Sequence, residues 1–383
     1  MKLAVVTAIP TPYRDPFWNV VAAHSDVESL DVYFCAAGKP DRPWTIDWEQ
    51  KFNAHFLPSY NLMKWVGADS SAYWVSGLQG ELARERHDAV IVGGYNHPSM
   101  LQTIRGCVGR KQPFFLMCET YKRRSSWKSA IKDRLLNWIF KHVAGGMPTG
   151  QLAAEYLRSY GISDDRLVYV PNVPDVVRLG ELAESLAKSA SEIRAKIGVP
   201  VECPVLTFVG RMIPKKRPEL VIKAFAQSAP ADAWLVMLGD GPLVPRCQEL
   251  IAELGISDRV RMPGFCQPQQ VPKYLSVSTA FVLPSSETWG VAAIEAVAMG
   301  IPTILSDEVG CHPDLIIDER YGAVVRAGCL EALAKAVGEK LDRPRSSVNS
   351  NQIVDSFSYH QVAERLVEGI DCTIARRPEV VTP

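Results

Sequence analysis

Two glutamates, Glu287 and Glu295, have seven residues between them in the stretch SSETWGVAAIEAVAMG, which covers residues 285–300. From Val291 onward this stretch predicts a helix that is apolar on nearly every side and therefore buried. A buried carboxylate needs a hydrogen-bonding partner, and the hydroxyl groups of a polyhydroxylated ligand are such partners. We therefore expect both acids to bind sugar hydroxyls. The alternative, in which Glu287 caps the helix and Glu295 is exposed, stays open.

The start of the same helix predicts an anion site. Gly290 is expected to open the helix, so the backbone N–H groups near Trp289, Gly290 and Val291 are donors at the positive end of the helix dipole. A phosphate group fits such an end.

A second stretch, FVGRMIPKKRPEL, also predicts an anion site. Gly210 and Arg211 follow a predicted strand, and Lys215, Lys216 and Arg217 precede the next helix. A glycine turn with cations at the carboxyl end of a strand can hold an anion. The alternative is a solvated basic loop.

The segment LVMLGDGP places Gly239 and Gly241 after another predicted strand. A dinucleotide-binding fingerprint would also need an acid at the end of the following strand, and VRMPGF has none. We therefore interpret both glycines as turn residues that permit a ligand to approach closely.

The elements that position these residues alternate between short apolar runs and longer amphipathic runs. Strands that are apolar on both faces, alternating with helices, predict parallel sheets covered by helices. The expected fold is α/β, with two doubly wound, Rossmann-like domains at 1–175 and 200–358 that face each other across a cleft. A polar connector is expected at 176–199, and a helix and tail at 359–383 that crosses back to the first domain.

Composition excludes several classes of protein. The 383 residues contain 42 Lys+Arg and 42 Asp+Glu, so no net charge attracts nucleic acid. The nine cysteines include no Cys-x-x-Cys pair, so we expect no zinc site and a reducing cytosol. The apolar run after Met1 is too short to span a membrane and has no cleavage site after it, so it predicts a buried strand and a cytoplasmic protein.

The segment 121–143 has seven Lys or Arg residues against the single acid Asp133, interleaved with aromatic residues. A basic amphipathic helix with aromatic residues is typical of an element that lies on an anionic membrane surface. A helix packed in the core with a solvated basic face is the alternative.

The motifs of the second half, in the order FVGRMIPKK, LGDGP, PGF and SSETWGVAAIEAVAMGIPTI, resemble the retaining glycosyltransferases of family 4, also called glycosyltransferases group 1, which have the GT-B fold. The resemblance covers the second half closely and the first half loosely. It implies a nucleotide-sugar donor, with no metal and no other cofactor, because cations and helix N–H groups stabilise the leaving diphosphate.

The resemblance also implies roles for single residues. Arg211 and Lys216 match the residues that neutralise the diphosphate, with Gly210 beside them. Glu295 matches the residue that holds the ribose hydroxyls, and Glu287 matches the one that contacts the donor sugar. The backbone of Thr288, Trp289, Gly290 and Val291 is expected near the sugar and phosphate. The nucleobase is expected against Pro263, Gly264 and Phe265.

The first half departs from the family pattern. AIPTPYRD has no Gly-rich turn after the first strand, so either Arg14 or the Thr11 region is expected to substitute for it. His97 is a candidate for the family's catalytic histidine, with Asn96 beside it, and a structural histidine is the alternative. Glu119 ends the next strand and is expected to face the cleft, and pairing with nearby cations is the alternative. Many members glycosylate lipid-linked acceptors, which would suit a peripheral membrane protein. A nucleotide-sugar epimerase and a non-catalytic nucleotide-sugar-binding protein are the alternatives.

Overall fold

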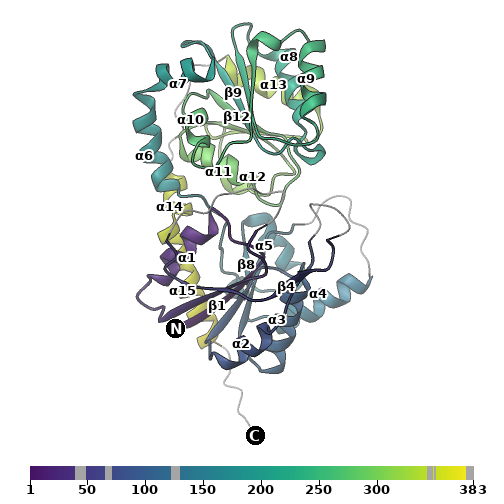
Figure 1. The fold of residues 1–383 in the computed structure, drawn as a ribbon, viewed down its shortest axis with the longest axis vertical. Coiled ribbons are helices and arrows are strands. Elements are labelled where there is room, and N and C mark those ends of the chain that lie inside the picture. The colour runs from purple at the N-terminus through teal and green to yellow at the C-terminus, as the bar shows by residue number, and fades with distance from the viewer. Residues whose placement is uncertain (39–48, 65–70, 122–129, 343–347, 349–350, 377–383) are drawn as a thin grey trace. The chain divides into compact units, whose positions relative to one another are not determined.

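The computed structural model describes residues 1–38, 49–64, 71–121, 130–342, 348 and 351–376. The chain divides into two compact units: Met1–Asn172 with Tyr359–Pro383, and Val173–Ser358. Each unit is a parallel sheet flanked by helices (Figure 1), so the predicted doubly wound α/β class is confirmed. The segment 176–199, expected as a connector, forms two helices, and the first of them packs against the second unit's helix α11.

The first unit contains a six-stranded sheet in the order β3-β2-β1-β6-β7-β8, with every pair of neighbours parallel. Its strands are β1 (Lys2–Thr7), β2 (Ser29–Phe34), β3 (Asn53–Phe56), β6 (Ala89–Val92), β7 (Phe114–Cys118) and β8 (Gly145–Pro148). A separate antiparallel hairpin consists of β4 (Ser59–Asn61) and β5 (Tyr73–Val75).

The helices of the first unit are α1 (Arg14–Ala22), α2 (Leu78–Arg84), α3 (Pro98–Gly109), α4 (Ala130–His142), α5 (Gln151–Arg158) and α15 (Tyr359–Ala375), with a 3-10 turn, η1 (Asp164–Arg166). The last helix, α15, lies beside α1, and Figure 1 shows them as yellow and purple ribbons. Phe17 of α1 and Tyr359 of α15 bring their rings to 6.2 Å in this contact.

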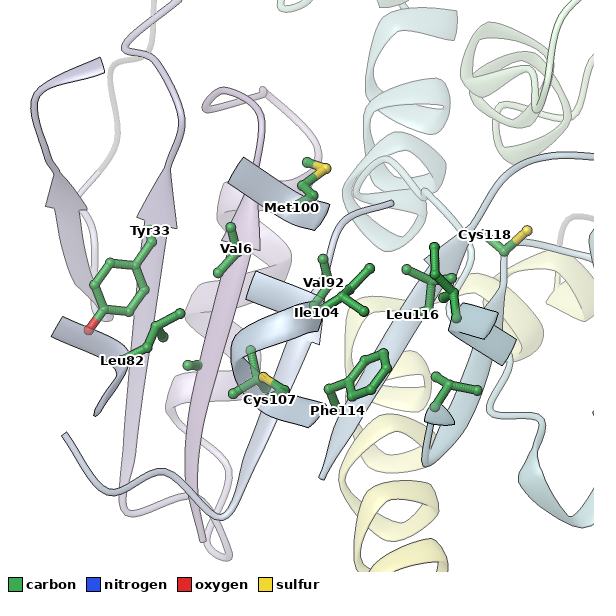
Figure 2. Close-up of a cluster of buried hydrophobic side chains, with 14 of the residues drawn as sticks. Val6, Tyr33, Leu82, Val92, Met100, Ile104, Cys107, Phe114, Leu116 and Cys118 are labelled. Carbon is green, nitrogen blue, oxygen red and sulfur yellow. The ribbon is translucent and has the colours of Figure 1, made fainter. Parts of the chain in front are cut away.

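One core cluster of the first unit lies between the sheet and α2, α3 and α4. Figure 2 shows Val6, Val92 and Leu116 on three strands, with Ile104 and Cys107 of α3 among the side chains that pack against them. The strands are apolar on both faces, as a sheet covered on both sides requires. This burial fixes the positions at which the strands end and the loops begin.

The second unit contains a parallel sheet in the order β11-β10-β9-β12-β13-β14. Its strands are β9 (Val205–Val209), β10 (Trp234–Leu238), β11 (Val260–Gly264), β12 (Ala280–Leu283), β13 (Thr303–Ser306) and β14 (Gly322–Val325). Its helices are α6 (Val176–Ala187), α7 (Ala190–Ile197), α8 (Pro218–Ser228), α9 (Val244–Glu253), α10 (Val271–Leu275), α11 (Val291–Ala298), α12 (His312–Leu315), α13 (Leu330–Leu341) and α14 (Asn351–Phe357), with 3-10 turns η2 (Pro214–Lys216) and η3 (Ser257–Arg259).

Both sheets have the same strand order when their strands are counted along the chain: third, second, first, fourth, fifth, sixth. The order reverses between the first and fourth strands, which are β1 and β6 in the first unit and β9 and β12 in the second. The loops at the carboxyl ends of these two strands diverge to opposite faces of the sheet, and ligands of open α/β sheets bind at this switch point.

Glycines let the loops after β9, β10 and β11 approach each other. The Gly210 amide donates to Leu238 O at 2.9 Å, and the Gly239 amide donates to Gly264 O at 2.8 Å. Gly239 has φ 134°, and a Cβ there would lie 2.0 Å from Gly210 O. At Gly241, with φ 151°, a Cβ would lie 2.6 Å from Met212 O. The glycines expected to admit a ligand are therefore required by the neighbouring backbone.

We predict that Gly239→Ala destabilises the second unit by about 2 kcal/mol or more, because a side chain at this φ is strained and its Cβ overlaps the Gly210 carbonyl. The thermal unfolding midpoint measures this effect. Gly180→Ala is the matched control: Gly180 lies in α6, and the nearest atom to its added Cβ is 3.9 Å away. Alanine should be neutral or slightly stabilising there. Equal midpoints for the two variants would contradict the account.

Candidate functional site

An ion pair joins the two loops that diverge at the switch point of the second unit. Lys216 lies in η2, after β9, and Glu287 lies in the loop after β12. The Lys216 Nζ donates to both carboxylate oxygens of Glu287, at 2.8 and 2.7 Å. The side chains are only 15% and 19% exposed, so water screens the pair incompletely. Two residues that the sequence assigned to one ligand are thus in direct contact.

Buried serines orient this pair. The hydroxyl of Ser285 donates to the same Glu287 carboxylate, and Ser285 O accepts a hydrogen bond from Ser306 Oγ at 2.5 Å. Both serines are fully buried. Sequence reasoning did not single out either serine, although Ser285 stands only two residues before Glu287.

Arg217 fixes the loop that carries Lys216. Its backbone is left-handed, with φ 53°, and this residue precedes the first turn of α8. Its guanidinium donates to Pro284 O at 2.6 Å and forms an ion pair with Glu308. These contacts tie the loops after β9, β12 and β13 together. The sequence showed Arg217 only as the third cation of a basic run, so its structural role was missed.

The loop from Glu287 to Gly290 pairs with the loop after β13. The Glu287 amide donates to Glu308 O at 3.0 Å, and the Gly310 amide donates to Glu287 O at 3.1 Å. A Cβ on Gly310 would lie 1.8 Å from Thr288 O, so the two backbones are in close contact. Thr288 is exposed, whereas the side chain of Trp289 is buried and its ring lies 6.4 Å from that of Phe357.

Helix α11 begins where the sequence predicted. Gly290 is its N-cap with φ 138°, and the first N–H bond within the helix runs from Ala293 to Gly290 O at 3.0 Å. The amides of Val291 and Ala292 precede this bond, so they are among the donors of the positive helix end. Val291, Ala292 and Glu295 are half-buried, while Ala293, Ile294 and Ala296–Ala298 are buried. The half-buried residues lie at helical spacings of one, three and four, which places them on one face.

Glu295 is therefore on the one face of α11 that the protein leaves partly open. Among the described residues the structure gives its carboxylate no hydrogen bond and no ion pair. Burial raises the pKa of the Glu295 carboxyl from 4.5 to about 7, because desolvation disfavours its charged form. This carboxyl is a ligand-binding candidate because no described residue compensates its charge.

The other predicted residues of the second unit lie at the same edge of its sheet. Arg211 is half-buried and follows Gly210 directly after β9. Pro263, Gly264 and Phe265 lie at the carboxyl end of β11, and the ring of Phe265 is well exposed. Their proposed contacts with ligand stay predictions.

In the first unit, Arg14 and Glu119 are in contact, although they lie far apart in the sequence. Arg14 donates to the Glu119 carboxylate at 2.7 Å, and Asn172 Nδ2 donates to the same oxygen at 2.6 Å. Arg14 follows the loop after β1, and Glu119 follows β7, so the cluster lies at the carboxyl edge of this sheet. Asn172 was not singled out by the sequence.

His97 and Asn96 lie in different environments, one buried and the other exposed. His97 is buried at the N-cap of α3, where its Nδ1 accepts the Tyr73 amide at 3.4 Å and its ring lies 5.2 Å from that of Tyr73. Asn96 is exposed. The structure thus shows a structural contact for His97, and its catalytic role stays a prediction.

The basic segment 121–143 is described at Tyr121 and from Ala130 onward, so Lys122, Arg123, Arg124, Trp127 and Lys128 lie outside the described residues. In α4, Leu136, Ile139 and Phe140 are buried, whereas Lys132, Arg134 and Lys141 are exposed. The described helix therefore has a core face and a cationic solvent face. Among the described residues no helix combines the length and hydropathy needed to cross a membrane, and no group of acidic, histidine or cysteine side chains could hold a metal ion.

Comparison with known proteins connects this geometry to a family. Residues 189–353 match the family described as glycosyl transferases group 1. D-inositol 3-phosphate glycosyltransferase of Nocardia farcinica is 28% identical over 318 residues, which are 79% of this chain and 66% of that protein. Alpha-D-kanosaminyltransferase of Streptomyces kanamyceticus is 33% identical over 225 residues, which are 56% of each chain. The chain thus spans less than two thirds of the length of each of these two relatives.

Solved structures match over nearly the whole chain. The Anabaena protein Alr3699/HepE in complex with UDP has a TM-score of 0.74 at 16% identity. The match covers 97% of this chain and 100% of the Anabaena chain. The lipopolysaccharide outer core galactosyltransferase WaaB has a TM-score of 0.67 at 18% identity and covers 97% of this chain and 99% of its own. Residues 189–353 of this chain are therefore similar to the glycosyl transferases group 1, and the chain has the GT-B fold.

Proposed function

We propose that this protein is a retaining glycosyltransferase that moves a sugar from a nucleoside-diphosphate sugar to an acceptor hydroxyl. The observation that carries the proposal is the Lys216–Glu287 ion pair at the switch point, beside the N-terminus of α11. The family match over this same unit supports it. The chemistry at this edge suits a ligand with both a diphosphate and sugar hydroxyls.

The proposed donor site divides into three parts. Arg211, Lys216 and the first amides of α11 bind the diphosphate, and Glu295 binds the ribose hydroxyls. Glu287 binds the transferred sugar while it holds Lys216 in place. The nucleobase lies against Pro263–Phe265, with Phe265 available to stack. A structural neighbour was solved with UDP, so UDP is the first nucleotide to test.

The proposed catalysis is electrostatic. Negative charge grows on the leaving diphosphate as its bond to the sugar breaks, and fixed cations and N–H dipoles nearby stabilise that charge. Lys216 is already oriented by two contacts to Glu287, so little reorganisation is needed when the charge forms. We propose that these groups make the transfer independent of a metal ion.

The acceptor is assigned to the first unit. Arg14, Glu119 and Asn172 form a polar cluster at the carboxyl edge of its sheet, where a hydroxylated acceptor would find donors and acceptors. We propose a lipid-linked acceptor and a peripheral position on the cytoplasmic face of a membrane, with the cationic face of α4 toward anionic headgroups. Product analysis with donor and acceptor separates transfer from epimerisation, and donor hydrolysis without acceptor separates an enzyme from a non-catalytic binder.

We predict that Arg211→Ala and Lys216→Ala each weaken nucleoside-diphosphate binding by about tenfold or more, because each removes a charge-assisted hydrogen bond. Calorimetric titration measures the effect, with the diphosphate that stabilises the protein most among UDP, GDP and ADP. Lys215→Ala is the matched control, since Lys215 is an exposed cation of the same loop and should leave affinity within about twofold.

EDTA is present throughout these titrations and in the assay of transfer. Unchanged affinity in folded Arg211→Ala and Lys216→Ala would remove the diphosphate from this loop. Affinity or turnover that appears only after Mg²⁺ or Mn²⁺ is added would contradict metal independence.

We predict that affinity for the intact nucleotide sugar falls by up to about tenfold between pH 8 and pH 6, because the carboxyl of Glu295 has a pKa of about 7 and its ionised form is the stronger acceptor. Glu295→Gln should bind more weakly at pH 8 and show a flat profile across this range. A sloping profile that persists in Glu295→Gln would assign the pH dependence to another group.

The raised pKa of Glu295 also makes the stability of the folded protein depend on pH. Because burial raises it, the group favours the folded state fully below its unfolded value of 4.5, and this contribution is lost as pH rises toward 7. Without ligand, Glu295→Gln should therefore gain stability relative to the parent protein as pH rises from 4.5 to 7, as measured by thermal unfolding.

A further inference from the structure

The hairpin β4–β5 presents an unusual concentration of exposed apolar side chains. Twelve large apolar side chains of the described residues are well exposed, and five of them fall between residues 56 and 74: Phe56, Tyr60, Leu62, Met63 and Trp74. Scattered single residues of this kind are normal, whereas a cluster marks an interaction surface.

The register of the hairpin explains why these residues are exposed together. Tyr60 pairs directly with Trp74, and the flanking pairs are Ser59 with Val75 and Asn61 with Tyr73. Side chains alternate between faces along a strand. Tyr73 and Val75 are therefore buried on the inner face, while Tyr60 and Trp74, 62% and 41% exposed, stand side by side on the outer face. Leu62 and Met63 directly follow β4 and are also exposed.

The hairpin is anchored at the carboxyl edge of the first unit's sheet. The Val75 amide donates to Ser99 Oγ at 2.8 Å, and Ser99 Oγ donates to Tyr73 O at 2.8 Å. Ser99 lies in the first turn of α3, directly after β6, and is fully buried. The outer face is thus held rigidly at the same edge as the Arg14–Glu119–Asn172 cluster.

The described residues of the hairpin carry a single charged side chain, Lys64, and Asp69 of its loop lies outside the described residues. The described residues of 53–77 contain no carboxylate, and Lys64 follows Met63. Tyr73 and Val75 of the hairpin pack in the same core cluster as Leu136 and Ile139 of α4, so α4 covers the same face of the sheet. Its solvent side carries Lys132, Arg134 and Lys141, while Asp133 is half-buried and accepts a hydrogen bond from Tyr160 at 3.3 Å.

We propose that the outer face of the β4–β5 hairpin inserts into the interfacial region of an anionic lipid bilayer. Tyr and Trp prefer this region, where an amphipathic ring meets both water and hydrocarbon, and Leu62 and Met63 enter the apolar layer. The cations of α4 and Lys64 meet the headgroups. A saccharide would stack on Tyr60 and Trp74 but would leave Leu62 and Met63 uncovered. The cations of α4 and Lys64 would attract an anionic lipid surface, whereas they would repel the same cations on a second copy of this protein.

This inference rests on the proposed function, because a lipid-linked acceptor is what would require the protein at a membrane. It adds a component to membrane binding that salt does not screen, because apolar insertion is independent of ionic strength whereas headgroup attraction decays within a Debye length of about 8 Å at physiological salt.

The test is co-sedimentation of the full chain with phosphatidylcholine vesicles that contain phosphatidylglycerol, at low and at high salt. The parent protein should bind more weakly at high salt but retain measurable binding. The triple variant Tyr60→Ser, Leu62→Ser, Trp74→Ser should lose at least about tenfold in partition coefficient at both salt concentrations. The double variant Leu62→Glu, Met63→Glu keeps the Tyr60–Trp74 pair and should show a similar loss.

The matched control is Val201→Ser with Leu254→Ser, which removes two exposed apolar side chains of the second unit and should sediment like the parent. Thermal midpoint and nucleotide binding check that every variant is folded. Vesicle binding that is unchanged in both hairpin variants would overturn the inference.

Two other results would also overturn it. One is a dimer by light scattering that dissociates in the triple variant, which would make a second copy the occupant. The other is oligosaccharide binding that depends on Trp74 without any vesicle binding. Loss of nucleotide binding tests the proposed function separately, because vesicle sedimentation does not require a donor.

Discussion

The ion pair between Lys216 and Glu287 holds the two halves of the candidate donor site together. It crosses the point where the strand order of the sheet reverses, so the loops it joins would otherwise diverge to opposite faces. Less than a fifth of either side chain is exposed. Removing one partner of a buried pair leaves an uncompensated charge, which costs about 3–5 kcal/mol in other proteins, whereas exposed pairs contribute about 0–1 kcal/mol. With 15% and 19% of its side chains exposed, the Lys216–Glu287 pair is expected to fall between these two cases.

The surrounding contacts keep that pair in one arrangement. Arg217 ties its own loop to Pro284 and Glu308, and Ser285 orients the carboxylate of Glu287. Close backbone contacts at Gly239 and Gly310 leave no space for side chains. A site built this way is pre-organised, so a charged ligand would meet fixed donors and cations without first ordering the loops. Glu295 differs, since no described contact compensates its carboxylate and burial raises its pKa to about 7.

Much of this architecture could be predicted from the sequence because its signals are local. Apolar runs at strand length marked both sheets, and Gly290 marked the start of α11. The strand order and the contacts between distant residues had no local signal. Lys216 and Glu287 are 71 residues apart, and Arg14 and Glu119 are 105 apart, so their pairing depends on the order of the strands. The glycines at 239 and 241 were predicted as turn residues, but the close contacts of their backbone with Gly210 and Met212 had no local signal.

Hydrogen–deuterium exchange of the protein with and without its nucleoside diphosphate, UDP first and then GDP and ADP, tests the central claim most directly. If the diphosphate binds at the switch point, amides of 210–217 and 284–295 should exchange more slowly in its presence, because a ligand that binds the pre-formed loops makes their local opening rarer and accepts hydrogen bonds from the start of α11. Protection confined to the first unit, or to helices away from these loops, would contradict the account.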